Sequence, residues 1–225
     1  MCGRFVRFRS WADLRGIMTL LSPSETPPEL SASYNVAPTQ KILVARQIDD
    51  KREGVVMRWG LIPSWAKDKK MAQINARADS ASEKPMFRSA FKKRRCLILA
   101  DGWYEWKANG KQKQPFFFRM KAEEPMLFAG LWETWDDDDG PVETCAILTT
   151  DANDLTKEVH NRMPVILAGD DALSWIEPGD DKDRLNALLR PFSPDKLAYH
   201  AVDSMVGNVR NNSPDCIKPA VSLFG

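Results

Sequence analysis

The sequence is poor in histidine, in paired cysteines and in net charge. Its 225 residues include two histidines and four cysteines, and no two cysteines stand in a CxxC pair, so a metal site has little to build on. No apolar run is long enough to span a membrane, and no signal peptide is recognisable. We therefore expect a reduced cytoplasmic protein, associated with the nucleoid if the source is bacterial, that uses neither a metal nor a cofactor.

A formal net charge of +1 excludes a protein coated in positive charge, so any nucleic-acid site must be a local patch. Apolar residues make up 43% of the chain and include eight tryptophans, which is enough to fill a sizeable core. No repeat or low-complexity linker divides the sequence. We expect a single domain over residues 1–225.

Short apolar runs joined by polar turns predict many strands. The expected strands are Ile42–Ala45, Val55–Ile62, Cys96–Trp106 with a break at Asp101–Gly102, Pro115–Met120, Met126–Trp135, Glu143–Thr149, Met163–Leu167 and Tyr199–Val202. The expected helices are Ser10–Leu21, Asp151–Val159, Asp170–Ile176 and Asp181–Leu189. This pattern predicts an α+β fold with a mostly antiparallel, barrel-like sheet and a few flanking helices.

The N-terminus carries an unusual chemical possibility, because Cys2 follows the initiator Met1 directly. Removal of Met1 would leave Cys2 with a free α-amine beside its thiol, groups with reference pKa values of about 7.7–8.0 and about 8.5. Such a 1,2-aminothiol condenses with an aldehyde through an imine and then closes a five-membered thiazolidine. The alternative is that Cys2 is simply the second residue of an ordinary protein.

Two further residues could move protons. Glu105 lies among Trp103, Tyr104 and Trp106, and partial desolvation by these rings would raise its pKa into a useful range. The alternative is a rim carboxylate that pairs with Lys107. His160 follows a predicted helix, a position that favours the charged imidazole, and could be a general acid or base or a structural hydrogen-bonding residue.

Several residues suit a nucleic-acid backbone. Asn75 and Arg77 would point the same way on an extended segment, where an amide can bind sugar oxygens and a guanidinium can bind phosphate. Arg4 and Arg162 could join the same patch. Trp65 follows Pro63–Ser64 in a polar loop and is a candidate for stacking on an unpaired base.

Taken together, the motifs resemble those of the SOS response-associated peptidase (SRAP) family across nearly the whole chain. The matching segments are Met1–Phe5, Tyr34–Pro38, Trp59–Pro63, Ile74–Arg77, Asp101–Trp106, Pro115–Phe117, Leu148–Thr150, His160–Pro164 and Val206–Val209. Each is weak alone, and their shared order makes the resemblance specific. Trp65 is followed here by Ala66, where some members have a second aromatic residue.

The resemblance implies an enzyme of DNA repair in the SOS response, which captures abasic sites in single-stranded DNA through a lyase-like, covalent thiazolidine cross-link. The implied catalytic residues are Cys2, Glu105, His160 and Asn75, and the implied DNA-binding residues are Gly3, Arg4, Pro38, Trp65, Arg77, Thr149 and Arg162. Single-stranded DNA would be the partner of a monomer. Two alternatives stay open, an autoproteolytic cysteine peptidase and a non-covalent binder of single-stranded DNA.

Overall fold

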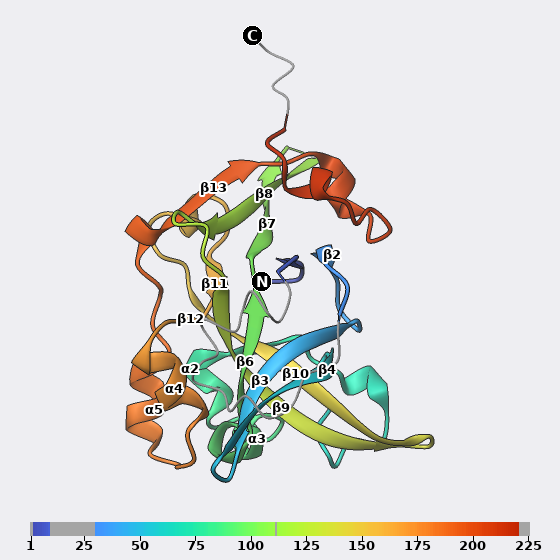
Figure 1. The fold of residues 1–225 in the computed structure, drawn as a ribbon, viewed down its shortest axis with the longest axis vertical. Helices are drawn as coiled ribbons and strands as arrows, with labels where there is room; N and C mark the ends of the chain where they lie inside the picture. Colours follow the sequence, from blue (N-terminus) through green and yellow to red (C-terminus); the bar gives the residue numbers. More distant parts are fainter. Residues whose placement is uncertain (1, 10–29, 111, 221–225) are drawn as a thin grey trace.

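Strands predominate in the computed structural model, which describes residues 2–9, 30–110 and 112–220 (Figure 1). The α+β fold expected from the sequence is confirmed, including its barrel-like sheet. The helix expected over Ser10–Leu21 lies outside the described residues. Within the described part of the chain, no helix is long and apolar enough to cross a membrane.

Five strands close into a barrel in which each pairs with the next. In order around the barrel they are β10 (Gly140–Asp151), β4 (Lys51–Trp59), β3 (Lys41–Ile48), β6 (Arg95–Ala100) and β9 (Met126–Asp137), which returns to β10. The β10–β4 pair is parallel and the other pairs are antiparallel. Three short strands extend this sheet: β5 (Asn75–Arg77), β11 (Arg162–Pro164) and β12 (Ile166–Leu167).

A second, antiparallel sheet crosses one end of the barrel. Its order is β13 (Leu197–Ala201), β8 (Gln112–Met120), β7 (Gly102–Asn109), β1 (Phe5–Arg7) and β2 (Ser33–Val36). In Figure 1 this sheet lies above the barrel, and β1, in dark blue, lies where the two sheets meet. The Phe5 ring packs edge-on against Trp59 of β4 and Phe128 of β9, so β1 is anchored to both sheets.

Two glycines shape the strands near this junction. Gly102 is the first residue of β7, and a Cβ atom there would come within 2.3 Å of the Phe118 carbonyl oxygen, so the close approach of β8 requires glycine. Gly60 has φ +128° and ends β4 at Trp59. The strand predicted over Val55–Ile62 therefore ends at Trp59, three residues earlier than expected, because the chain turns at Gly60, and it begins earlier, at Lys51.

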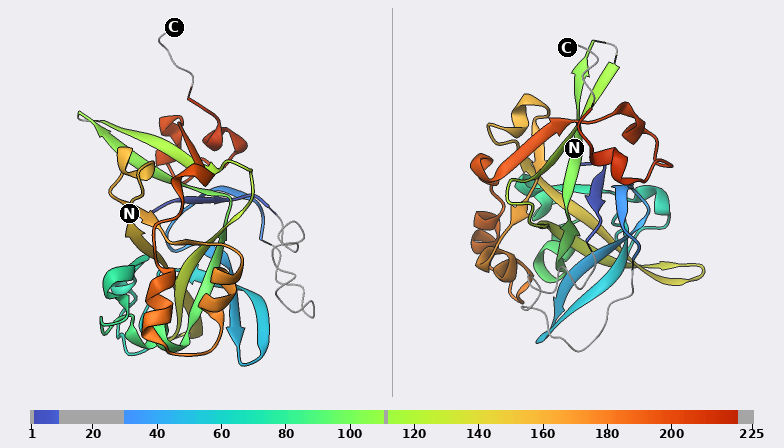
Figure 2. Two further views of the ribbon diagram at one scale, coloured as in Figure 1. Left: turned by 90° about the vertical axis from the view of Figure 1, so that its left-hand side faces the viewer. Right: turned by 45° about the horizontal axis from the view of Figure 1, so that its top comes forward.

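Among the described residues, four short α-helices lie against the barrel: α2 (Ala78–Ala81), α3 (Arg88–Lys93), α4 (Asp170–Ile176) and α5 (Lys182–Leu188). Figure 2 shows α4 and α5, in orange, beside its lower half. One face of the barrel strands, with Leu43 and Leu97, packs against Trp175 and Leu185 of these helices. The opposite face packs with Phe5, Trp103 and Phe118 of the second sheet. Because successive side chains of a strand point to opposite faces of the sheet, the barrel strands contribute to two separate hydrophobic cores.

The expected helix over Asp151–Val159 is wrong. Strand β10 continues to Asp151, which pairs with Arg162 of β11, and only Thr156–Glu158 forms a 3-10 turn, η2. The Asn153 side chain accepts a hydrogen bond from the Thr156 N–H at 2.8 Å and donates to the Phe192 carbonyl at 2.7 Å. These contacts fix a turn where the local sequence favours a helix. The helices expected at Asp170–Ile176 and Asp181–Leu189 are confirmed.

Candidate active site

The N-terminal segment is held in the interior of the molecule. Strand β1 lies between β2 and β7, and the Tyr104 N–H donates to the Arg4 carbonyl at 3.0 Å, which extends the pairing with β7 toward the N-terminus. Cys2 is fully buried, and its Sγ lies 3.9 Å from the Arg4 carbonyl oxygen. The thiol is therefore fixed in one place.

Asn75 contacts Cys2 directly. Its Nδ2 donates to the Cys2 carbonyl oxygen at 2.9 Å. Strand β5 carries this side chain and runs parallel to β10, with Asn75 opposite Ile147. The Asn75 Oδ1 atom is buried and has no hydrogen-bond partner among the described residues. A buried amide oxygen of this kind is suited to accept a hydrogen bond from a ligand.

Glu105 is buried near Cys2. It lies on β7 opposite Phe116, with 2% of its surface exposed. Burial raises the pKa of its carboxyl group to about 7. Burial also raises the pKa of the Cys2 thiol, and the negative charge of Glu105 adds to that shift, so the two groups interact electrostatically. At neutral pH, Glu105 can therefore both accept and donate a proton.

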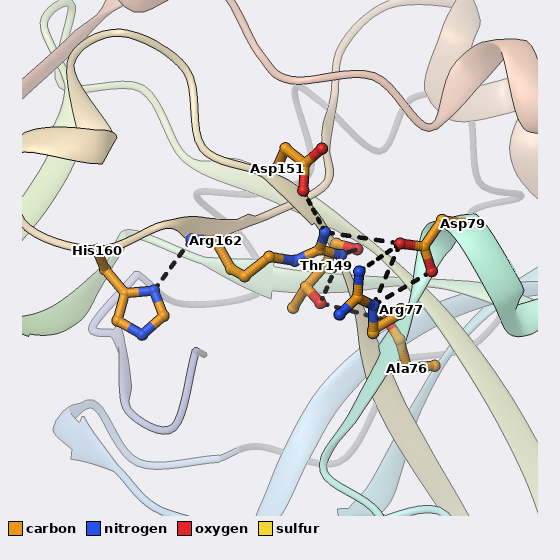
Figure 3. A network of polar contacts seen from close by, with 7 residues as sticks. All are labelled: Ala76, Arg77, Asp79, Thr149, Asp151, His160 and Arg162. Atoms are coloured by element: carbon orange, nitrogen blue, oxygen red, sulfur yellow. Dashed lines mark hydrogen bonds and ion pairs between the residues drawn. The ribbon is translucent and has the colours of Figure 1, made fainter.

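His160 is held in one tautomer by the backbone. Its Nδ1 accepts a hydrogen bond from the Arg162 N–H at 3.0 Å, so a neutral ring carries its proton on Nε2 (Figure 3). Burial lowers the pKa of His160, and the positive charge of Arg162 adds to this. The expectation of a charged imidazole at a helix end is therefore wrong, because the 3-10 turn Thr156–Glu158 precedes His160 and the shift of its pKa favours the neutral ring.

Arg77 and Arg162 lie close together on strands β5 and β11, each of which pairs with β10. An Arg77 Nη atom lies 2.6 Å from Asp79, and an Arg162 Nη atom lies 2.5 Å from Asp151 and 3.9 Å from Asp79 (Figure 3). We call these two arginines and two aspartates the arginine cluster. Asp79 forms ion pairs with both Arg77 and Arg162 and so holds their guanidinium groups close to each other.

Thr149 contacts the arginine cluster through Arg162. It is fully buried on β10, opposite both Arg77 of β5 and Pro164 of β11. Its carbonyl oxygen accepts a hydrogen bond from Arg162, and its Oγ1 lies 3.5 Å from Arg162 Nη and from the Ala76 carbonyl. The two strands that carry the arginines are thus set by their pairing with β10.

Arg4 has a different environment. It donates to Asn35 Oδ1 at 2.6 Å, to the Val206 carbonyl at 2.9 Å and to the Gly207 carbonyl at 3.1 Å. Asn35 in turn donates to the carbonyls of Val206, Asn208 and Asn211. None of the described contacts joins Arg4 to the arginine cluster. Arg4 ties the segment after Cys2 to the loop from Val206 to Asn211.

The remaining expected DNA-binding residues lie near the surface. Gly3 is partly buried between Cys2 and Arg4, and Pro38 is partly buried in the turn after β2. Trp65 is 56% exposed. Its loop is anchored because Trp135 Nε1 donates to the Ala66 carbonyl at 2.7 Å. Trp65 is thus an exposed ring on a fixed loop, which suits stacking.

The structure therefore brings Cys2, Asn75 and Glu105 together, and it joins His160 to the arginine cluster through Arg162. The sequence did not single out Asp79 and Asp151, although the Arg77-x-Asp79 spacing is a usable signal. No group of three or more histidine, cysteine or acidic side chains in the described ranges is placed to hold a metal ion.

Comparisons with known proteins agree on one family. The family model described as "SOS response associated peptidase (SRAP)" matches residues 1–209. The Abasic site processing protein YoqW of Bacillus subtilis is 42% identical over 97% of this chain and 99% of its own length. The Abasic site processing protein YedK of Escherichia coli is 30% identical over 97% of this chain and all of its own. A crystal structure of a Bacteroides thetaiotaomicron protein superposes with a TM-score of 0.83, at 28% identity over 98% of this chain and 100% of that one.

Proposed function

This chain belongs to the SOS response-associated peptidase (SRAP) family, and we propose that it processes abasic sites in single-stranded DNA by covalent capture through Cys2. The two relatives named above as abasic site processing proteins match 97% of this chain, at 42% and 30% identity. The observation that carries the proposal is the placement of Asn75 and the buried Glu105 beside an N-terminal cysteine. This arrangement offers proton transfer and a hydrogen-bonding amide where an aldehyde would meet an aminothiol.

The proposed capture proceeds in two balanced steps once Met1 has been removed. The α-amine of Cys2 adds to the aldehyde carbon of the ring-opened abasic sugar, and one water leaves, which gives an imine. The Cys2 sulfur then adds to the imine carbon, and the thiol proton passes to the nitrogen. The product is a thiazolidine that joins the protein to the DNA, and no further reagent is consumed.

Glu105 and His160 would handle the protons of these steps. Glu105, with a pKa of about 7, would take the proton of the anomeric hydroxyl as the sugar ring opens and return a proton to the departing water. Neutral His160 would donate its Nε2 proton in a hydrogen bond to the sugar. Asn75 would orient the sugar through its buried Oδ1 while it holds the Cys2 carbonyl.

A cysteine peptidase is the second candidate, because the family description names a peptidase and Cys2 could be its nucleophile. That chemistry requires a cysteine thiolate at the start of the reaction. Burial raises the pKa of Cys2 and the charge of Glu105 raises it further, so the thiol is protonated at neutral pH. In the capture mechanism the amine attacks first and the thiol can stay protonated until the ring closes. The electrostatics therefore favour capture.

The arginine cluster would bind the DNA backbone. The Arg77 side chain is 55% exposed and directed by Asp79, whereas Arg162 is buried and fixed by Thr149 and Asp151. Arg77 would therefore make the direct phosphate contact, and Arg162, with Thr149 behind it, would set its position. Arg4 and Gly3 would shape the backbone beside Cys2, and Pro38 and Trp65 would contact the flanking strand.

Replacing Arg77 with alanine is expected to weaken binding to single-stranded DNA and to flatten its salt dependence. One lost phosphate contact reduces the slope of log K against log salt by about 0.7. Binding can be measured by fluorescence anisotropy with an oligonucleotide that lacks an abasic site, in a Cys2→Ala background. Arg184→Ala is a matched control, since Arg184 is also exposed and ion-paired, at 3.9 Å from Glu177. An unchanged slope for Arg77→Ala would remove Arg77 from the DNA interface.

The capture itself is tested by a denaturing gel. The protein is incubated with a single-stranded oligonucleotide carrying one abasic site, or with the same oligonucleotide carrying a tetrahydrofuran residue that has no aldehyde. We expect a slowly migrating, heat-stable band with the abasic site alone. If both oligonucleotides are bound in a native gel and neither gives a band on denaturation, the protein is a non-covalent binder and the proposal is wrong.

A further inference from the structure

A polar pocket opens directly beside the arginine cluster. It has a volume of about 290 Å³ and lies between α2, the end of β10 and α5. Its lining includes Asp79, Ser82, Glu83, Asp151, Arg162 and Asn186. Asp79, Asp151 and Arg162 are members of the arginine cluster, so the pocket and the cluster share one wall (Figure 3).

The pocket lies along a path that begins at Cys2. Asn75, at the start of β5, contacts Cys2, and Arg77 follows two residues later, about 7 Å further along an extended strand. Helix α2 begins at Ala78, and its Asp79 lines the pocket. A DNA strand that leaves an abasic sugar at Cys2 and places its phosphate at Arg77 would therefore bring its next nucleotide to this pocket.

The charges of the lining suit a nucleobase and disfavour a second phosphate. Three carboxylates line the pocket with two cations, and both cations are paired, Arg162 with Asp151 at 2.5 Å and Lys182 with Glu83 at 3.1 Å. Each carboxylate is engaged by a cation as well, but its two oxygens offer about four acceptor sites and so keep capacity for a ligand donor. Asp79 stays ionised because its hydrogen bond from Arg77 lowers its pKa. Carboxylates accept hydrogen bonds from the exocyclic amine of cytosine, and an asparagine amide matches the edge of adenine. Thymine offers no exocyclic amine to these groups.

We infer that this pocket is a subsite for the nucleobase next to the abasic residue, on one side of it only, and that it prefers cytosine or adenine to thymine. The inference rests on the proposed function, because the path is defined from the captured sugar. It assigns to Asp79, Glu83 and Asn186 a role in substrate selection. Sequence context around the lesion would then set the rate of capture.

The test is a series of single-stranded oligonucleotides with one abasic site, in which the base on either side is varied independently. Cross-linking rates are measured at subsaturating protein. On one side, cytosine or adenine is expected to react at least about fivefold faster than thymine, the discrimination of one good base contact. On the other side the base is expected to have little effect. Equal rates for all bases on both sides would overturn the inference.

Two variants of α5 place the effect in the pocket. Asn186→Phe fills the pocket from its wall, and Ala187→Phe adds the same ring at an exposed neighbour that does not line it. We expect Asn186→Phe to abolish the base preference and Ala187→Phe to keep it. A preference that survives Asn186→Phe would exclude the pocket. Failure of the proposed function is distinct, because no cross-link would then form with any oligonucleotide.

Discussion

Blocking the α-amine of Cys2 is expected to abolish cross-linking to abasic DNA while leaving the fold intact. A leader peptide joined to Cys2 converts the amine to an amide, and an amide nitrogen cannot form an imine with an aldehyde. The measurement compares a chain with a protease-cleavable leader before and after the leader is removed, on a denaturing gel. We expect no band before removal and full cross-linking after it.

Variants of Cys2 separate this result from a general loss of the site. Cys2→Ser keeps the amine but lacks the thiol, so we expect a transient imine that borohydride can trap and no heat-stable product. Cys2→Ala should behave in the same way. A stable cross-link formed by the leader-bearing chain would contradict the amine mechanism, and it would favour direct attack by the thiol.

Replacing Glu105 with glutamine is expected to slow cross-linking at pH 7 by at least about 100-fold, the lower range for loss of a general acid or base. In the natural protein the carboxyl has a pKa of about 7, so its basic form grows as the pH rises from 6 to 8. The cross-linking rate should rise together with the fraction of Glu105 in its basic form. The variant keeps the size and the polarity of the side chain but cannot exchange a proton.

The pH profile gives the sharper readout. We expect the rise centred near pH 7 to disappear in Glu105→Gln and a weaker rise from deprotonation of the α-amine, with a reference pKa of about 7.7–8.0, to remain. Rates from pH 5.5 to 9 under single-turnover conditions distinguish the two. An unchanged profile in the variant would show that Glu105 is not the titrating group.

Stability provides the folding control, and its sign follows from the direction of the shift. Burial raises the pKa of Glu105 from 4.5 to about 7, so the folded state holds this proton more tightly than the unfolded state. The resulting stabilisation is fully present below pH 4.5 and is lost as the pH rises through about 7. Glutamine has no such dependence. We therefore expect the melting temperature of Glu105→Gln at pH 8 to be at least as high as that of the natural protein. This result would exclude misfolding as the cause of slow capture.

The environment of Glu105 could be predicted from the sequence because its determinants are local. A carboxylate flanked by Trp103, Tyr104 and Trp106 on a strand is partly desolvated wherever that strand packs, and the structure places it 2% exposed. The strands themselves follow from short, largely apolar runs. The fold class follows from their number and from the short turns between them.

Contacts between distant segments explain what the sequence did not predict. Arg4 binds Asn35 and Val206, which lie 31 and 202 positions away, so its tie to the C-terminal loop has no local signal. The Asp151–Val159 segment has helical spacing, but pairing of Asp151 with Arg162 keeps its start in a strand. Asp79 and Asp151 acquire their role only when β5, β10 and β11 lie side by side.

The state of the Cys2 thiol after cross-linking tests the central proposal most directly. An imine and a thiazolidine have the same mass, because each forms with the loss of one water, but only the imine leaves a thiol that iodoacetamide can alkylate. The denatured cross-link is treated with iodoacetamide, digested and analysed by mass spectrometry. We expect the Cys2 peptide to carry the sugar, with one water lost and no alkyl group. An alkylated Cys2 in the cross-linked peptide would contradict ring closure and the account built on it.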